Sequence, residues 1–134
     1  MTQNIYLDID GVLLVNDKEA SAYADEFIQS VIRKYPDTTY WLTTHYWRGQ
    51  NTAKLVLAPY LMPKTVALLD SIKPAVWNEY KTQGIDFSQP FLWFDDDLFN
   101  EEREELEAQN ALSSWIEVDL AKNQYQLKDL IELL

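Results

Sequence analysis

The stretch Ile5-Tyr6-Leu7-Asp8-Ile9-Asp10-Gly11-Val12 decides how the rest of the chain is interpreted. Its apolar residues predict a short strand that ends in two acids and a glycine. Asp8 and Asp10 are two positions apart, so both carboxylates lie on one face of an extended chain. Gly11 permits a sharp exit from that strand. The stretch predicts either a site at the mouth of a sheet or an ordinary strand end with acidic turn residues.

Apolar periodicity and the positions of Pro and Gly predict that strands and helices alternate along the chain. The expected strands are the opening stretch and residues 38–44, 65–70, 91–94 and 115–118. The expected helices are residues 18–35, after a plausible N-cap at Asn16-Asp17, and residues 51–58, 71–84, 98–109 and 124–134. This alternation predicts an α/β, three-layer Rossmann-like sandwich around a five-stranded, mainly parallel sheet. We expect one domain that spans residues 1–134.

Composition limits the classes of function. With 134 residues, of which 47% are hydrophobic, the chain can bury a core of ordinary size. The net charge of −11 leaves no basic stripe for a phosphate backbone, so a nucleic-acid partner is not expected. The absence of cysteine excludes disulfides and thiolate metal sites. No apolar run reaches membrane-spanning length and no signal peptide is evident, so we expect a cytoplasmic protein without a membrane partner.

Polar side chains follow three of the expected strands. These residues are Asp8 and Asp10, then Thr43 and Thr44, then Asp95-Asp96-Asp97. Because parallel strands end at one edge of a sheet, we expect these groups to converge there, and Lys73 can face the same edge. Carboxylates can bind Mg²⁺ or attack phosphorus, and a metal and a lysine can neutralise the transferring group. The pattern therefore indicates a magnesium-dependent phosphoryl site.

Four motifs in this order resemble the haloacid dehalogenase (HAD) superfamily of phosphohydrolases. The first motif of that family, DxDGV, stands here as Asp8-Ile9-Asp10-Gly11-Val12. The second, an apolar strand that ends in Thr or Ser, is matched by Tyr40-Trp41-Leu42-Thr43. The third, a lysine, is matched by Lys73, and the fourth, a strand that ends in paired acids, by Phe91-Leu92-Trp93-Phe94-Asp95-Asp96. The resemblance covers most of the chain.

The resemblance implies a two-step phosphoryl transfer. Asp8 would attack phosphorus and form an aspartyl-phosphate. Asp10 would protonate the leaving group and then assist the attack of water on the intermediate. Mg²⁺ would be held by the Asp8 carboxylate, the backbone carbonyl of Asp10 and Asp95. Asp96 would be a further ligand or a neighbour of the ligands.

The resemblance also implies that Thr43 binds the phosphoryl oxygens and that Lys73 neutralises charge on the nucleophile and the phosphate. The residues alone leave rivals for both roles. Thr44 could replace Thr43, and Lys64 or Lys81 could replace Lys73.

Several further residues have a functional and a structural interpretation. Thr44, His45 and Arg48 follow the second motif and are candidates for binding the substrate. Asp97 is expected to be the N-cap of the next helix rather than a metal ligand. The acidic run from Glu101 to Glu107 is expected to be a solvated helix face. Three tryptophans are expected in the core: Trp41, Trp77 and Trp93.

The segments between the motifs are too short for a large cap domain, so we expect a capless member with an open site. An open site suits a bulky substrate, such as a phosphorylated macromolecule, or closure by a partner chain. Nothing in the sequence identifies the substrate or the oligomeric state. The alternative is a regulatory or protein-interaction module with weak or no turnover, such as a phospho-acceptor at Asp70 after the third expected strand.

Overall fold

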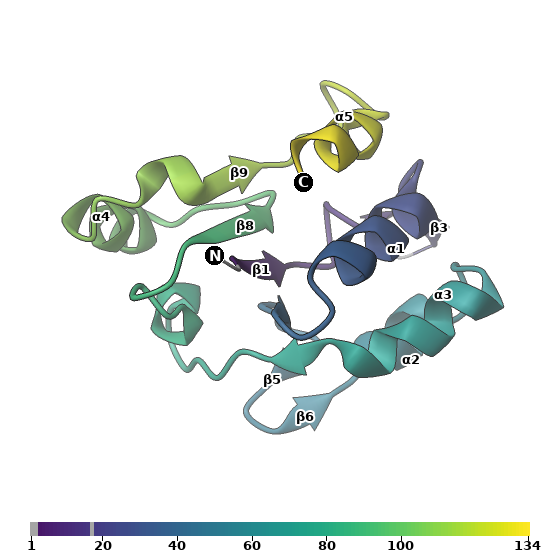
Figure 1. The fold of residues 1–134 in the computed structure, drawn as a ribbon, viewed down its shortest axis with the longest axis horizontal. Coiled ribbons are helices and arrows are strands. Elements are labelled where there is room, and N and C mark those ends of the chain that lie inside the picture. Colours follow the sequence, from purple (N-terminus) through teal and green to yellow (C-terminus); the bar gives the residue numbers. More distant parts are fainter. Residues whose placement is uncertain (1–2, 17) are drawn as a thin grey trace.

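A computed structural model describes residues 3–16 and 18–134 of the chain. Its centre is a five-stranded parallel sheet with the order β7-β4-β1-β8-β9 (Figure 1). The strands are β1 (Asn4–Leu7), β4 (Thr39–Trp41), β7 (Lys73–Pro74), β8 (Phe91–Asp95) and β9 (Trp115–Glu117). The apolar stretch of the first motif therefore forms the middle strand, between the strands of the second and fourth motifs. The predicted α/β class and parallel sheet are confirmed.

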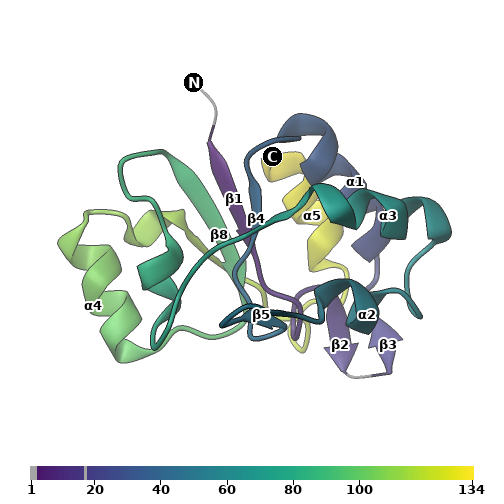
Figure 2. The same cartoon turned by 90° about the horizontal axis from the view of Figure 1, so that it is seen from below.

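Helices cover both faces of the sheet. One face carries α1 (Ala24–Lys34), α3 (Pro63–Leu68) and α5 (Gln126–Leu133), and the other carries α4 (Asn100–Ala108), as Figure 2 shows. The burial pattern of β1 explains this arrangement, because Ile5 and Leu7 pack in one apolar cluster and Tyr6 packs in another. No helix in the described part of the chain is long and apolar enough to cross a membrane.

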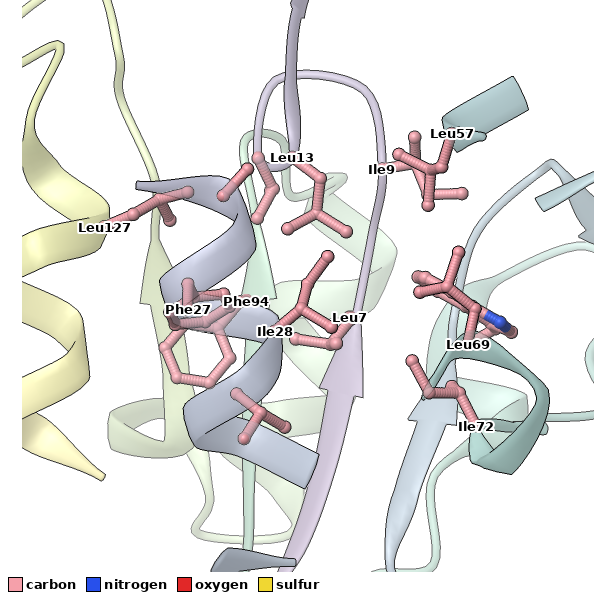
Figure 3. Close-up of a cluster of buried hydrophobic side chains, with 14 of the residues drawn as sticks. Leu7, Ile9, Leu13, Phe27, Ile28, Leu57, Leu69, Ile72, Phe94 and Leu127 are labelled. Atoms are coloured by element: carbon pink, nitrogen blue, oxygen red, sulfur yellow. The ribbon is translucent and has the colours of Figure 1, made fainter. Parts of the chain in front are cut away.

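The larger apolar cluster fixes the helices against the central strands. Phe27 and Ile28 of α1 pack there with Leu7 of β1 and Phe94 of β8 (Figure 3). The rings of Phe27 and Phe94 make an edge-to-face contact with centroids 5.4 Å apart. This packing fixes β1 and β8 beside each other, and with them the acids that follow.

The prediction of the third strand is wrong. Residues 65–70 form most of α3 and the 3-10 helix η1 (Leu69–Ser71), and the strand is β7, which was expected to begin a helix. Pro63 in the first turn favours the helix, and Thr65 is buried, where its hydroxyl accepts a bond from Gln29. Pro74 lacks a donor, so it suits the edge strand β7. The rest of 71–84 is turn and loop up to the 3-10 helix η2 (Lys81–Gly84).

Two small hairpins replace parts of the expected helix and loop after β1 and β4. The first consists of β2 (Leu14–Asn16) and β3 (Glu19–Ala20), so the helix expected from residue 18 begins only at Ala24. Asn16 does not cap that helix, because its side chain accepts a bond from the backbone of Lys18, and Asp17 lies outside the described residues. The second consists of β5 (Tyr46–Trp47) and β6 (Gln50–Asn51) and precedes α2 (Ala53–Leu57).

Candidate active site

Asp8 and Asp95 are brought together by the pairing of the two central strands. Leu7 of β1 is in register with Phe94 of β8, and the backbone N–H of Asp8 donates to the carbonyl of Phe94 at 3.1 Å. Asp8 directly follows β1, and Asp95 is the last residue of β8. Both are buried. The expected meeting of the first and fourth motifs at the carboxyl edge of the sheet is confirmed.

Four donors hold the carboxylate of Asp95. Lys81 Nζ and Trp93 Nε1 donate to its Oδ2 at 2.7 and 3.1 Å. The backbone N–H groups of Asp96 and Asp97 donate to its Oδ1 at 2.8 and 3.3 Å. Asp97 was expected to cap α4, but the residue before that helix is Phe99. With both oxygens engaged, the orientation of the Asp95 carboxylate is fixed before any ligand binds.

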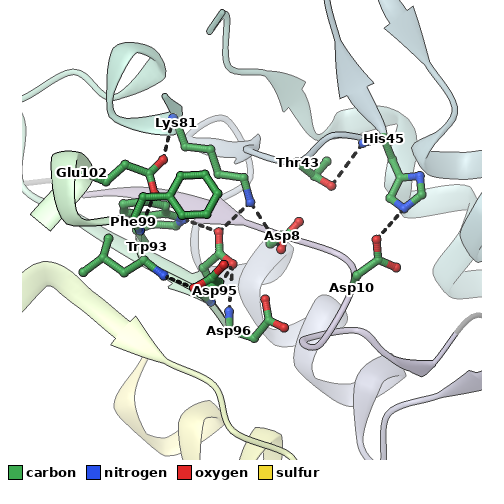
Figure 4. A network of polar contacts seen from close by, with 12 residues as sticks. Asp8, Asp10, Thr43, His45, Lys81, Trp93, Asp95, Asp96, Phe99 and Glu102 are labelled. Atoms are coloured by element: carbon green, nitrogen blue, oxygen red, sulfur yellow. Dashed lines mark hydrogen bonds and ion pairs between the residues drawn. The ribbon is translucent and has the colours of Figure 1, made fainter. Parts of the chain in front are cut away.

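Lys81 joins the two buried acids (Figure 4). Its ammonium lies 3.3 Å from Asp8 Oδ2 and 2.7 Å from Asp95 Oδ2. Burial alone would lower the pKa of Lys81, but the two carboxylates outweigh burial and raise the pKa. Burial, and then the charge of Asp8, raises the pKa of Asp95 to about 8. One ammonium therefore does not fully compensate two buried carboxylates, and the site favours additional positive charge.

Lys73 is not at this site, so the prediction for the third motif is wrong. Its Nζ donates to the backbone carbonyl of Asp37 at 2.9 Å, and Asp37 precedes β4, at the opposite edge of the sheet. The physical reason is that the third strand is β7 and not residues 65–70. Lys73 is the first residue of β7, so the chain reaches the carboxyl edge of the sheet only after this lysine. Lys81, one of the two rivals, is the lysine that contacts the acids, whereas Lys64 is exposed on α3.

Glu102 holds the backbone of Lys81. This side chain is buried, and its two oxygens accept the N–H groups of Lys81 at 2.8 Å and Phe99 at 3.0 Å. It therefore ties η2 to the start of α4. The expectation of a solvated acidic face is wrong at this position. A Glu three residues after a helix cap often accepts the N–H of that cap, but the usual signature has Ser or Thr at the cap, where this chain has Phe99.

The hydroxyls after β4 have different environments. Thr43 is fully buried, and its Oγ1 accepts the backbone N–H of His45 at 3.3 Å. Thr44 is exposed and lines the cavity beside the acids. His45 Nε2 lies 2.9 Å from Asp10 Oδ2, so this histidine contacts an acid of the first motif. The structure thus favours Thr44 over Thr43 as the hydroxyl that a ligand can reach.

Arg48 and Asp70 are not brought into the site. Arg48 Nε and Nη2 donate to Asn78 Oδ1 at 3.0 and 2.6 Å, and its guanidinium lies 4.3 Å above the ring of Trp47. Asp70 belongs to η1 and is exposed, where it pairs with Lys54 at 3.1 Å. Asp70 therefore does not end a strand, so the position expected for a phospho-acceptor is wrong.

An open cavity of about 200 Å³ lies over these groups. Its charged lining consists of Asp8, Asp10, Lys81, Asp95, Asp96, Asp97 and Glu102. Thr44, Trp77 and Phe99 complete the wall. Trp41 and Trp93 are core residues as expected, but Trp77 is only partly buried and borders the cavity.

Three carboxylates could hold a metal ion in this cavity. Asp8, Asp95 and Asp96 can each place one oxygen within 4.8 Å of the other two. Gly11 makes room for this cluster: its φ is +79°, and a Cβ there would collide with the Asp96 carboxylate. Burial raises the pKa of Asp96. A hydrogen bond with Asp95 lowers it in part, and the adjacent charge of Asp8 raises it further. Hard oxygen donors with uncompensated charge fit Mg²⁺.

Comparisons with protein-family models, with curated proteins and with solved structures found no match to this chain. A function must therefore be argued from the chemistry of the site, because a Rossmann-like sheet supports many activities. In this chain, that chemistry is concentrated at Asp8, Lys81, Asp95 and Asp96.

Proposed function

We propose that the protein is a Mg²⁺-dependent phosphohydrolase that forms an aspartyl-phosphate on Asp8, within the HAD-like group that its motifs resemble. One observation carries the proposal: the buried Asp8 carboxylate contacts the Lys81 ammonium and belongs to a cluster of three carboxylates. A nucleophile, a fixed cation and hard oxygen ligands therefore lie within one cavity. This combination suits phosphoryl transfer, in which a carboxylate attacks phosphorus and fixed positive charge stabilises the transferring group.

The carboxylates of Asp8, Asp95 and Asp96 would hold Mg²⁺, and the backbone carbonyl of Asp10 is expected as a further ligand. When bound, the ion would supply positive charge that stabilises the phosphoryl oxygens. The raised pKa of Asp95 is consistent with this role, because burial beside Asp8 leaves negative charge that one lysine does not neutralise.

The two acids of the first motif, Asp8 and Asp10, have different roles in the reaction. An Asp8 oxygen attacks phosphorus while the bond from phosphorus to the leaving oxygen breaks, and Asp10 gives that oxygen a proton. Water then attacks phosphorus, Asp10 takes a proton from the water, and inorganic phosphate leaves as the Asp8 carboxylate is restored. Asp10 is exposed and lies 2.9 Å from His45 Nε2, so it can exchange protons with solvent and with this histidine.

Two further residues act on the phosphate. Lys81 would neutralise charge on the nucleophile and on the transferring group, in the role that the sequence motif suggested for Lys73. The Thr44 hydroxyl lines the cavity and can donate to a phosphoryl oxygen, while Thr43 positions the loop through its bond to His45.

Hydrolysis of p-nitrophenyl phosphate with and without Mg²⁺ tests the proposal. We expect slow turnover that requires Mg²⁺ and is abolished in Asp8→Asn. Asp70→Asn is a suitable control, because Asp70 is an exposed aspartate outside the cavity. Turnover that survives in Asp8→Asn, or no turnover of a broad panel of phosphate esters by folded protein with Mg²⁺, would contradict the proposal. The second result would favour a module that acts through protein contacts.

A further inference from the structure

Two aromatic side chains border the cavity but take no part in the proposed chemistry. Trp77 and Phe99 line the same cavity as Asp8 and Lys81. The Phe99 side chain is 53% exposed, which leaves much of it available for contact. A ligand whose phosphate lies at Asp8 would therefore extend past at least one aromatic surface.

Trp77 is packed against a second tryptophan. The ring of Trp47 packs on it at a centroid distance of 5.8 Å and an interplanar angle of 37°. Trp47 Nε1 donates to the backbone carbonyl of Asn78 at 2.9 Å, and Arg48 covers Trp47 while bonding the Asn78 side chain. The hairpin β5–β6 thus fixes Trp77 before a ligand arrives. A surface ordered in advance loses little conformational entropy when it binds a ring.

The charge of the cavity restricts what can accompany the phosphate. Six carboxylates line it, and Lys81 is the cation among its lining residues. Even with one Mg²⁺ bound, the formal charge of the lining is negative. A leaving group that carries further phosphates would be repelled, whereas an uncharged ring would not.

From these observations we propose that the substrate is a monophosphate ester whose leaving group carries a planar aromatic ring and no further negative charge. Trp77 and Phe99 contact that ring and select it. The inference rests on the proposed function, because the phosphate has to lie between Asp8 and Lys81. Nucleoside monophosphates and arylmethyl phosphates belong to this class, and nucleoside triphosphates and nucleic acid strands do not.

The direct test compares benzyl phosphate with cyclohexylmethyl phosphate in the presence of Mg²⁺. Both esters release a primary alcohol, so they differ mainly in the aromaticity of the ring. We expect kcat/KM to be about five- to tenfold higher for benzyl phosphate, the gain typical of an aromatic contact. Trp77→Leu and Phe99→Leu should each lower this ratio towards one, while cyclohexylmethyl phosphate is still hydrolysed. Tyr125→Leu, which removes an equally exposed ring outside the cavity, should leave the ratio unchanged.

Equal kcat/KM values for the two esters in the wild-type protein would overturn the inference, as would a ratio that neither substitution lowers. Binding of benzylphosphonate and cyclohexylmethylphosphonate by calorimetry separates this result from a failure of the proposed function, because a phosphonate is not hydrolysed. Preferential binding of benzylphosphonate that Trp77→Leu removes would support ring selection even if no ester were turned over. Equal binding of the two phosphonates would overturn it.

Discussion

Lys81 Nζ lies 2.7 Å from Asp95 Oδ2, although the lysine begins a 3-10 turn and the aspartate ends a central strand. The same ammonium reaches Asp8, so one cation links the acids of the first and fourth motifs. The backbone of this lysine is held by Glu102, and Asp95 is held by Trp93. These contacts make the lysine part of a preformed site rather than a mobile surface charge.

Removal of the Lys81 charge should destabilise the fold. In Lys81→Met, Asp8 and Asp95 remain buried without a cation, so we expect the free energy of unfolding to fall by about 3 kcal/mol. Lys73→Met should change it by less than about 0.5 kcal/mol, because Lys73 is exposed. Urea unfolding of both variants measures the difference. Equal losses for the two substitutions would show that Lys81 does not compensate the acids.

Mg²⁺ should stabilise the folded protein through the carboxylate cluster. At a concentration ten times its Kd, the ion should raise the free energy of unfolding by about 1.4 kcal/mol. Asp96→Asn should weaken this effect, whereas Asp97→Asn should retain it, because Asp97 lies outside the three-carboxylate cluster. Calorimetric unfolding with Mg²⁺ and with a chelator provides the measurement. The cluster would not be the metal site if Mg²⁺ had no effect on the wild-type protein.

The two glycines with positive φ should respond differently to alanine. Gly11 and Gly49 have φ values of +79° and +80°, so either substitution should cost about 1 kcal/mol of stability in backbone strain. Only at Gly11 would the new Cβ collide with Asp96, whereas nothing lies within 4 Å of the position at Gly49. Gly11→Ala should therefore also weaken Mg²⁺ binding, as titration calorimetry can measure. Equal Mg²⁺ affinity in both variants would contradict this role of Gly11.

Glu102 should act through the position of Lys81. Glu102→Ala removes the acceptor for two partly buried backbone N–H groups, so we expect a loss of about 1 to 2 kcal/mol in stability and a lower kcat. Glu101→Ala, at the neighbouring exposed position, should change neither quantity appreciably. Amide hydrogen exchange at Lys81 adds a structural measurement, and exchange should be faster only in Glu102→Ala. Unchanged protection of that amide would exclude the positioning role.

The central part of the fold was predictable because its signals are local. The apolar runs that end in Asp8 and Asp95 are continuous, and such runs are typical of strands buried on both faces. These strands pair side by side, so the acids that follow them meet at one edge. The position of Asp8, Asp10, Asp95 and Asp96 around one cavity could therefore be inferred from the sequence.

The region between α2 and β8 could not be predicted in the same way. Thr65-Val66-Ala67-Leu68 has the composition of a strand, but it forms a helix after Pro63 that packs against α1. Because residues 65–70 are helical, Lys73 lies in β7 rather than at the start of a helix, and Lys81 is the lysine beside the acids. The hydrogen bonds that position Lys81 join it to residues distant in sequence, such as Glu102. No local sequence pattern predicts such bonds. The packing of the Trp77 ring against the Trp47 ring is likewise a tertiary contact.

Phosphorylation of Asp8 during turnover can be tested by chemical trapping of the aspartyl-phosphate. Wild-type protein is mixed with Mg²⁺ and benzyl phosphate, quenched and reduced with borohydride, which converts an aspartyl-phosphate to homoserine. Peptide mass spectrometry then locates the modified residue. We expect homoserine at position 8, and none when Mg²⁺ is omitted. Release of phosphate without modification of Asp8, or modification at Asp70 instead, would contradict this expectation.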